Sequence, residues 1–205
     1  MDHFDVKELK NSGSRIVNGI LDFLAEIPSS NQPKVIDKPE EKCRKITKDA
    51  SINAAMISGS LAIPIGPLGI ATVLPDLISI WKIQAQLIVD IAAVYGKDAL
   101  ILREQMLYCL FRHTASQAFR DFVVRAGERV FVKQVSLSAT RSLLEKIGVK
   151  ISQQLGGKAA SRWLPIVGAA GVAFYSFYDT TQVGKTAVTI YKEIVDDNSS
   201  TSAAA

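Results

Sequence analysis

The sequence predicts an all-α protein, a single helical domain with two Pro/Gly-interrupted apolar segments between its helices. Apolar residues recur every three or four positions through most of the 205 residues, which is the spacing of one helix face. Strand-like alternation is limited to "RVFVKQVSL" and "VAFYSFY", and both stretches lie beside helical patterns. A chain of this length can form one domain with a sizeable core.

Residues 1–39 are predicted to form an N-terminal amphipathic helix and a proline-rich linker. A Ser-Gly-Ser break is expected in the helix at residues 12–14. The linker, Pro28–Pro39, contains three prolines among polar residues. The apolar stripe of the helix comprises Ile16, Val17, Ile20, Leu21, Leu24 and Ile27.

Residues 40–196 are predicted to form the main helical domain, and residues 197–205 a disordered tail. Pro39, followed by two glutamates, is typical of a helix start. Pro75 and Asp76 are expected to begin the clearest helix, which Gly96 ends. The helices expected after it cover residues 98–113, 114–135, 139–155 and 180–195.

The two apolar segments are the most unusual feature of the chain. Ala50–Pro75 contains 26 consecutive uncharged residues and Trp163–Tyr178 contains 16. The first is long enough to span a bilayer, but prolines and glycines interrupt it, and a broken backbone is not tolerated in lipid unless protein or water covers it. Three interpretations stay open: buried connections in an ordinary core, the lining of a cavity for acyl chains, or a hairpin that enters one leaflet.

A binding site for a lipid or a fatty acyl chain is one interpretation of the apolar helix after Asp76. Gln84 and Asp90 interrupt its apolar pattern, and a buried polar group needs a partner. That partner is either a ligand headgroup or a structural hydrogen bond. The candidate ligand-binding residues are Trp81, Gln84, Leu87, Ile88, Asp90, Ile91, Pro165, Gly168, Phe174 and Tyr178.

Positive charge is concentrated in one part of the chain. Residues 103–162 contain eleven Lys and Arg against four Asp and Glu, whereas the net charge of the whole chain is only +4. A basic block favours an anionic partner, here an anionic phospholipid membrane, although a solvated helix face has the same pattern. The candidate membrane-surface residues are Arg120, Arg125, Arg129, Lys133 and Arg141.

The sequence contains no recognisable catalytic or cofactor site. "QVGKT" resembles the end of a phosphate-binding loop, but Asp179 occupies the position of its first glycine, and phosphate would be repelled there. Cys109 and His113 lie one helical turn apart, and two ligands do not make a metal site. With two histidines in the chain, a Ser-His-Asp triad is not expected. We expect no enzyme activity, no cofactor, no metal and no nucleic-acid binding.

The pattern "LPDL…W.IQ.QL..DIA..YGK" over Leu74–Lys97 is the most specific motif of the chain. It resembles the EcsC family of bacterial proteins, and the resemblance extends from about Arg44 to Ile194. "LPIVGAAGVAFYSFYDTTQVGKTA" agrees in order and spacing. The resemblance implies a helical, membrane-associated protein found near membrane transport and secretion functions, and it implies no catalytic residue.

These observations lead to one functional expectation. The protein is expected to bind lipid or another apolar ligand without catalysis, at an anionic membrane surface. Because the N-terminus lacks the pattern of a signal peptide, we expect a cytoplasmic protein that associates peripherally with the inner membrane. The alternatives are an effector or interaction protein that inserts into and permeabilises membranes, and a less favoured enzyme acting on lipids. The sequence does not predict an oligomeric state.

Overall fold

The computed structural model describes the backbone of residues 6–25, 27–61, 70–98, 101–115, 137–158 and 165–203. Side-chain surroundings are described within residues 14–60, 77–98, 101–115, 140–151 and 170–195. The described backbone is helical and contains no strand, which confirms the all-α prediction. Its helices are α1 (Val6–Ala25), α2 (Pro39–Leu61), α3 (Ile70–Val94), α4 (Arg103–Phe111), α6 (Leu137–Lys158) and α7 (Pro165–Ala203).

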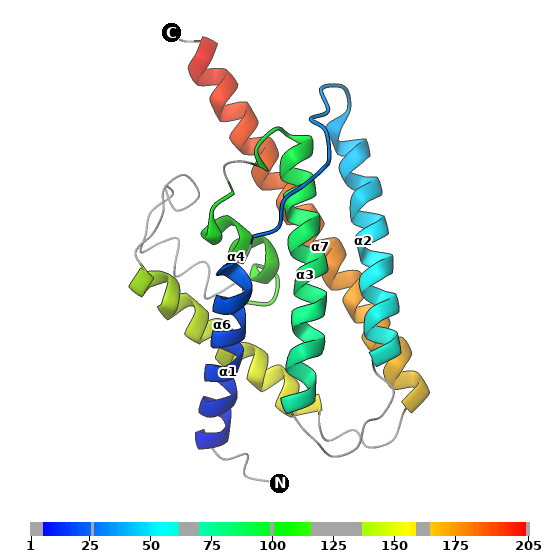
Figure 1. Cartoon of the computed structure of the whole chain (residues 1–205), viewed down its shortest axis with the longest axis vertical. Coiled ribbons are helices and arrows are strands. Elements are labelled where there is room, and N and C mark those ends of the chain that lie inside the picture. Colours follow the sequence, from blue (N-terminus) through cyan, green and yellow to red (C-terminus); the bar gives the residue numbers. More distant parts are fainter. Residues whose placement is uncertain are drawn as a thin grey trace.

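Helices α2, α3 and α7 pack against one another and form the centre of the molecule (Figure 1). α2 and α7 run antiparallel, as three contacts along their length show: Lys192 with Glu40, Gly184 with Thr47 and Thr181 with Ser51. α1 packs against α6 and α3, while α4 contacts α3 and α7. The arrangement places the end of α2 and the beginning of α3 and α7 at one end of the molecule (Figure 1).

Helix α3 provides the centre of the core. Leu87, Ile88 and Ile91 are almost completely buried. The helix ends at Val94 and is capped, as predicted, by Gly96, which has a positive φ of 68°. The Gly96 N–H donates to the Ala93 carbonyl and the Lys97 N–H donates to the Ala92 carbonyl. These two hydrogen bonds define a Schellman motif, which glycine favours because it has no Cβ.

Several predicted helix boundaries were wrong. α3 begins at Ile70 and passes through Pro75, because packing against α2 and α7 can outweigh the one hydrogen bond that a proline removes. α1 continues through the expected break at residues 12–14. α4 is shorter than the predicted helix over residues 98–113. The predicted helix over residues 114–135 lies almost wholly outside the described residues.

The second Pro/Gly segment is part of a helix rather than a connection. α7 is continuous from Pro165 to Ala203, so residues 165–178 are helical. Pro165 occupies the first helical position, where its missing N–H costs no hydrogen bond. The tail expected to be disordered from residue 197 is helical as far as residue 203. Residues 62–69 of the first apolar segment and residues 163 and 164 of the second lie outside the described residues.

The linker has no helix between residues 27 and 38, as predicted. It is attached to the second half of α3 by hydrogen bonds. The Val35 N–H donates to the Val94 carbonyl over 2.9 Å, and the Ser30 hydroxyl donates to the Asp90 carboxylate over 2.6 Å. The linker therefore holds α1 and α2 in fixed positions on the same core.

Candidate functional site

The predicted ligand-binding residues of α3 lie in the core. Trp81, Leu87, Ile88 and Ile91 are buried, and the Trp81 ring contacts Phe111 edge-on, with ring centroids 5.4 Å apart. Phe111 is the last residue of α4, so this aromatic pair joins α3 to α4. A role of these four residues in ligand binding stays a prediction.

Gln84 belongs to a polar cluster between α3, α7 and the end of α4. Only 1% of Gln84 is exposed. Its amide nitrogen donates to the Asp179 carboxylate over 2.7 Å and to the Thr180 hydroxyl over 3.2 Å. The other carboxylate oxygen of Asp179 contacts Nε2 of His113. The polar partner that the sequence required for Gln84 is therefore a pair of side chains on α7.

Sequence reasoning missed the role of Asp179 and His113. Nothing in their spacing signals a contact, because 66 positions separate them. Among the described residues, Nδ1 of His113 and Oε1 of Gln84 have no hydrogen-bond partner.

The described residues also contain no group of three or more potential metal ligands. Cys109 is fully buried, and burial raises the pKa of its thiol strongly, with a smaller opposing effect of Arg112.

Asp90 lies apart from this cluster. Its carboxylate accepts hydrogen bonds from the Ser30 hydroxyl and from the Gln86 amide over 3.0 Å. Gln86 also donates to the carbonyl of Ser29. Asp90 thus connects α3 to the linker, and the structure does not bring it together with Gln84.

Phe174 and Tyr178 lie on the surface of α7, where 72% and 54% of their areas are exposed. They belong to a group of exposed large side chains on α7 and on the facing part of α2. We call this group the apolar surface. It consists of Ile52, Met56 and Ile57 of α2 and Val172, Phe174, Tyr175, Phe177 and Tyr178 of α7.

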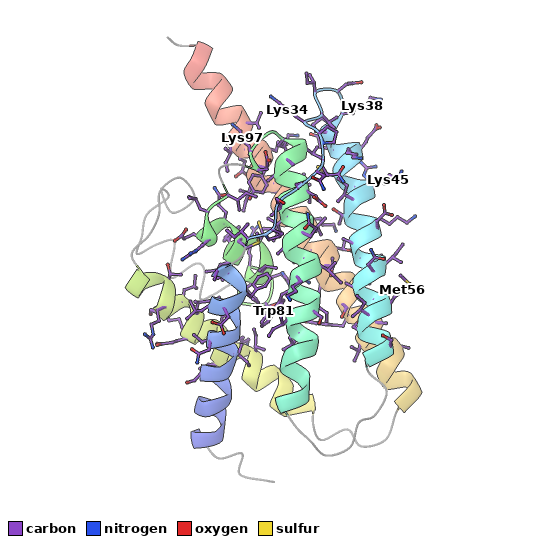
Figure 2. All side chains as sticks on the ribbon, in the orientation of Figure 1. Lys34, Lys38, Lys45, Met56, Trp81 and Lys97 are labelled. Atoms are coloured by element: carbon purple, nitrogen blue, oxygen red, sulfur yellow. The ribbon has the colours of Figure 1, made fainter. Side chains whose placement is uncertain are left out.

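The antiparallel packing of α2 and α7 brings these residues to the same end of the helix pair. The hydrogen bond between Ser51 and Thr181, 3.0 Å long, marks its inner limit. Figure 2 shows Met56 on the part of α2 that lies beside the beginning of α7. Pro165 and Gly168 lie in the first turn of α7, and their side-chain surroundings are outside the description.

The predicted membrane-surface residues are mostly outside the described part of the chain. Arg120, Arg125, Arg129 and Lys133 fall within residues 116–136. Arg141 is exposed on α6, with Glu145 at 3.7 Å. The structure adds a basic group that the sequence analysis did not identify, because acids balance the bases in residues 1–50. Arg44, Lys45 and Lys48 are exposed on α2, and Figure 2 shows Lys45 on the same helix as Met56.

One described helix is long and apolar enough to cross a membrane by length and composition. It is α3, over residues Leu77–Val94, and 56% of this window is buried inside the protein. A buried core helix of a globular protein has the same composition.

A model of the EcsC protein family matches residues 19–193. The match covers most of the chain, and the protein therefore belongs to the EcsC family, as the sequence resemblance indicated. The matched region begins inside α1, and it includes the linker. No curated protein and no solved structure matches the chain.

Proposed function

We propose that this protein binds lipid at an anionic membrane surface and has no catalytic activity. The observation that carries the proposal is the apolar surface of α2 and α7. Monomeric soluble proteins expose single apolar side chains, but large side chains gathered on one region mark an interaction site for protein or membrane. Two of the predicted binding residues, Phe174 and Tyr178, belong to this surface.

The charges beside the apolar surface favour an anionic membrane over a protein partner. Arg44, Lys45 and Lys48 are exposed on the part of α2 that precedes the apolar surface, with the acidic Glu41 and Asp49 exposed beside them. Each basic side chain near an anionic bilayer contributes about 1 kcal/mol to binding. The cationic excess of residues 103–162 would act in the same direction. Because anionic lipid is concentrated in the cytoplasmic leaflet, we propose peripheral association with the inner membrane from the cytoplasm.

The environment of His113 supports a role without catalysis. His113 is the one histidine in the described residues, and it contacts the Asp179 carboxylate. No described hydroxyl or thiol is hydrogen bonded to the ring. A nucleophile activated by this histidine would need such a contact. The cluster instead joins α4 to α7 through Asp179.

A second candidate function is permeabilisation of the membrane by an inserted apolar segment. It is favoured by the absence of charge from residues 163–178, which include the α7 part of the apolar surface. Release of a dye trapped in vesicles distinguishes a permeabilising protein from one that binds lipid and leaves the bilayer intact.

Flotation of the purified protein with liposomes tests the proposal. We expect binding to vesicles that contain phosphatidylglycerol, with weaker binding to neutral phosphatidylcholine vesicles. Replacing Arg125, Arg129 and Lys133 together by Gln is expected to weaken binding to the anionic vesicles, and circular dichroism checks that the fold is intact. The same substitution of Arg44, Lys45 and Lys48 compares the two basic regions directly. Absence of wild-type binding to every vesicle would remove the membrane from the proposed function.

A further inference from the structure

The end of the α2–α7 pair that carries the apolar surface has an unusual distribution of small and large side chains. Its buried residues are small: Ser51, Ala54 and Ser58 on α2, and Ser176 and Thr180 on α7. Its exposed residues include the large members of the apolar surface, beside the smaller Asn53, Ser60, Ala170 and Gly171. A helix pair in water normally buries its large apolar side chains and exposes its small polar ones. This end instead buries small residues between the two helices and exposes several large apolar ones, as helices packed in lipid do.

Three hydroxyls of this end, those of Ser51, Ser58 and Thr181, have partners within the helix pair. Ser58 donates to the Ala54 carbonyl over 2.8 Å, and Thr181 donates to the Phe177 carbonyl over 2.8 Å. Ser51 and Thr181 are hydrogen bonded to each other between the helices. These three hydroxyls therefore need no water. Internal satisfaction of polar groups is a requirement for a segment that enters the hydrocarbon of a bilayer.

The parts of α2, α3 and α7 that lie at this end are uncharged, although they are far apart in the sequence. The beginning of α1, with Lys7, Glu8 and Lys10, and the end of α6, at Lys158, lie at the same end of the molecule and carry charge (Figure 1). The uncharged stretches of α2, α3 and α7 cover residues 50–61, 70–75 and 165–178. The helix contacts bring all three stretches to one end of the molecule (Figure 1). The first charges on α2 and α7 are Asp49 and Asp179. Asp179 is held by Gln84 and His113.

We infer that this end of α2 and α7 enters the acyl-chain region of one membrane leaflet. The inference deepens the proposed function and rests on it. Residues 50–61 of α2 are about 18 Å long at about 1.5 Å per residue. A bilayer has a hydrocarbon core of about 30 Å, so one leaflet provides about 15 Å. The uncharged end thus fits one leaflet, and the exposed bases of α2 follow at the level of the headgroups.

The inference assigns membrane contact to a different helix from the one that composition selects. α3 is the helix with the composition of a membrane span, but most of that span is buried in the protein. Most of the exposed large apolar side chains among the described residues belong to α2 and α7, next to residues that are small and polar. Because water-exposed area decides which side chains can contact lipid, insertion follows the exposed surface rather than the mean hydropathy of a helix.

Matched glutamine substitutions test the inference without changing charge. The double variant Met56→Gln/Phe174→Gln alters the apolar surface at two exposed positions. The control is Ile36→Gln, because Ile36 is 91% exposed and lies in the linker, outside the apolar surface. We expect the double variant to bind phosphatidylglycerol vesicles in 0.5 M salt at least tenfold more weakly than wild type, and the control to bind as wild type does.

A depth measurement makes the test independent of affinity. An environment-sensitive dye is attached through Phe174→Cys, and in a second protein through Ile36→Cys. Lipids carrying a nitroxide on the acyl chain should quench the dye at position 174 and leave the dye at position 36 unchanged.

Three outcomes are decisive. Reduced binding of the double variant with quenching at position 174 supports insertion. Wild-type binding with an unaffected double variant and no quenching overturns the inference and leaves peripheral lipid binding in place. Absence of wild-type binding overturns both proposals.

Discussion

Single residues determine how closely α2 and α7 approach. Gly184 faces Thr47, and a Cβ atom built on Gly184 would lie 2.5 Å from both Oγ1 and Cγ2 of Thr47. Such a distance is shorter than van der Waals contact, so no side chain fits there. Gly171 lies on the same helix with no atom within 4 Å of its Cβ position. One helix thus contains a glycine required by packing and a glycine that packing does not require.

Alanine at these two glycines is expected to have opposite effects on stability. Gly184→Ala should lower the free energy of unfolding by about 1–3 kcal/mol through overpacking. Gly171→Ala should raise it by about 0.5–1 kcal/mol, because alanine favours the helix. Urea unfolding followed by circular dichroism measures both. Adding Thr47→Ala to Gly184→Ala should recover part of the loss, and equal effects of the two alanines would refute the close contact.

Burial of Cys43 predicts a loss of stability in alkali. Desolvation, with a smaller effect of Glu40, raises the pKa of this thiol from 9.0 to about 11. A group whose pKa is raised in the folded state contributes its stability below the unfolded pKa and loses it as the pH rises toward the folded value. The urea midpoint is therefore expected to fall between about pH 9 and pH 11. The fall should be smaller in Cys43→Ala, and a constant midpoint across this range would contradict the prediction.

At the scale of elements, α1 and the linker form part of the main core. Ile16, Ile20 and Leu24 of α1 are buried in the same cluster as residues of α3 and α6. The family match also begins within α1. The division of the chain at residue 39 stays a prediction about domain organisation, and the packing of α1 provides a direct way to test it.

Neighbouring residues of α1 offer a matched pair for that test. Ile20 is fully buried, whereas 41% of Leu21 is exposed. Ile20→Ala is expected to lower the free energy of unfolding of the whole protein by about 2–5 kcal/mol. Leu21→Ala should change it by about 0.5 kcal/mol or less. If α1 were a separate domain, Ile20→Ala would leave the main unfolding transition of residues 40–196 unchanged.

α7 changes its role along its length. From residue 180 to residue 191 it buries Val183, Ala187 and Tyr191 in the core. From residue 172 to residue 178 its large side chains are exposed. Asp179 lies at the transition and is bound to α3 through Gln84. The same helix can therefore be anchored in the bundle and present a surface to a membrane.

At the scale of the whole molecule, charged and apolar side chains are unevenly distributed along the long axis. The end that holds the beginning of α2 carries ion pairs, including Lys192 with Glu40 at 3.0 Å and Lys38 with Glu41 at 3.6 Å. Figure 2 places Lys34, Lys38 and Lys97 at this end. The opposite end contains the apolar surface on α2 and α7, together with the charged beginning of α1 (Figure 1). We expect the charged end to face water when the apolar end contacts a bilayer, and the two dye positions described above report that orientation.

The sequence predicted much of the fold because helical periodicity is a local property. Residues 77–95 repeat apolar positions at helical spacing, and the structure buries most of them. Pro39 and Gly96 are boundary signals that act within a few residues, and both predictions were confirmed. The start of α3 and the continuity of α7 were predicted incorrectly, because packing between helices outweighed the local cost of proline and glycine.

The candidate site was predicted only in part. The sequence singled out Phe174, Tyr178 and Gln84, but it grouped them as the lining of one site. The structure separates them: Gln84 is buried in a polar cluster, whereas Phe174 and Tyr178 are exposed. Apolar composition does not distinguish a side chain that faces the core from one that faces outward, because the helices of this protein have large apolar residues on both their buried and their exposed faces.

The sequence by itself determined the helical class, the family and the two uncharged segments, since each depends on residue order alone. Only the tertiary structure decided that these segments meet at one end of the molecule, where several small residues are buried and several large apolar residues are exposed. It also paired Asp179 with Gln84 and His113, residues that the sequence keeps far apart. The physical reason is that packing joins faces of distant helices, and the exposure of a side chain is defined only after those faces have met.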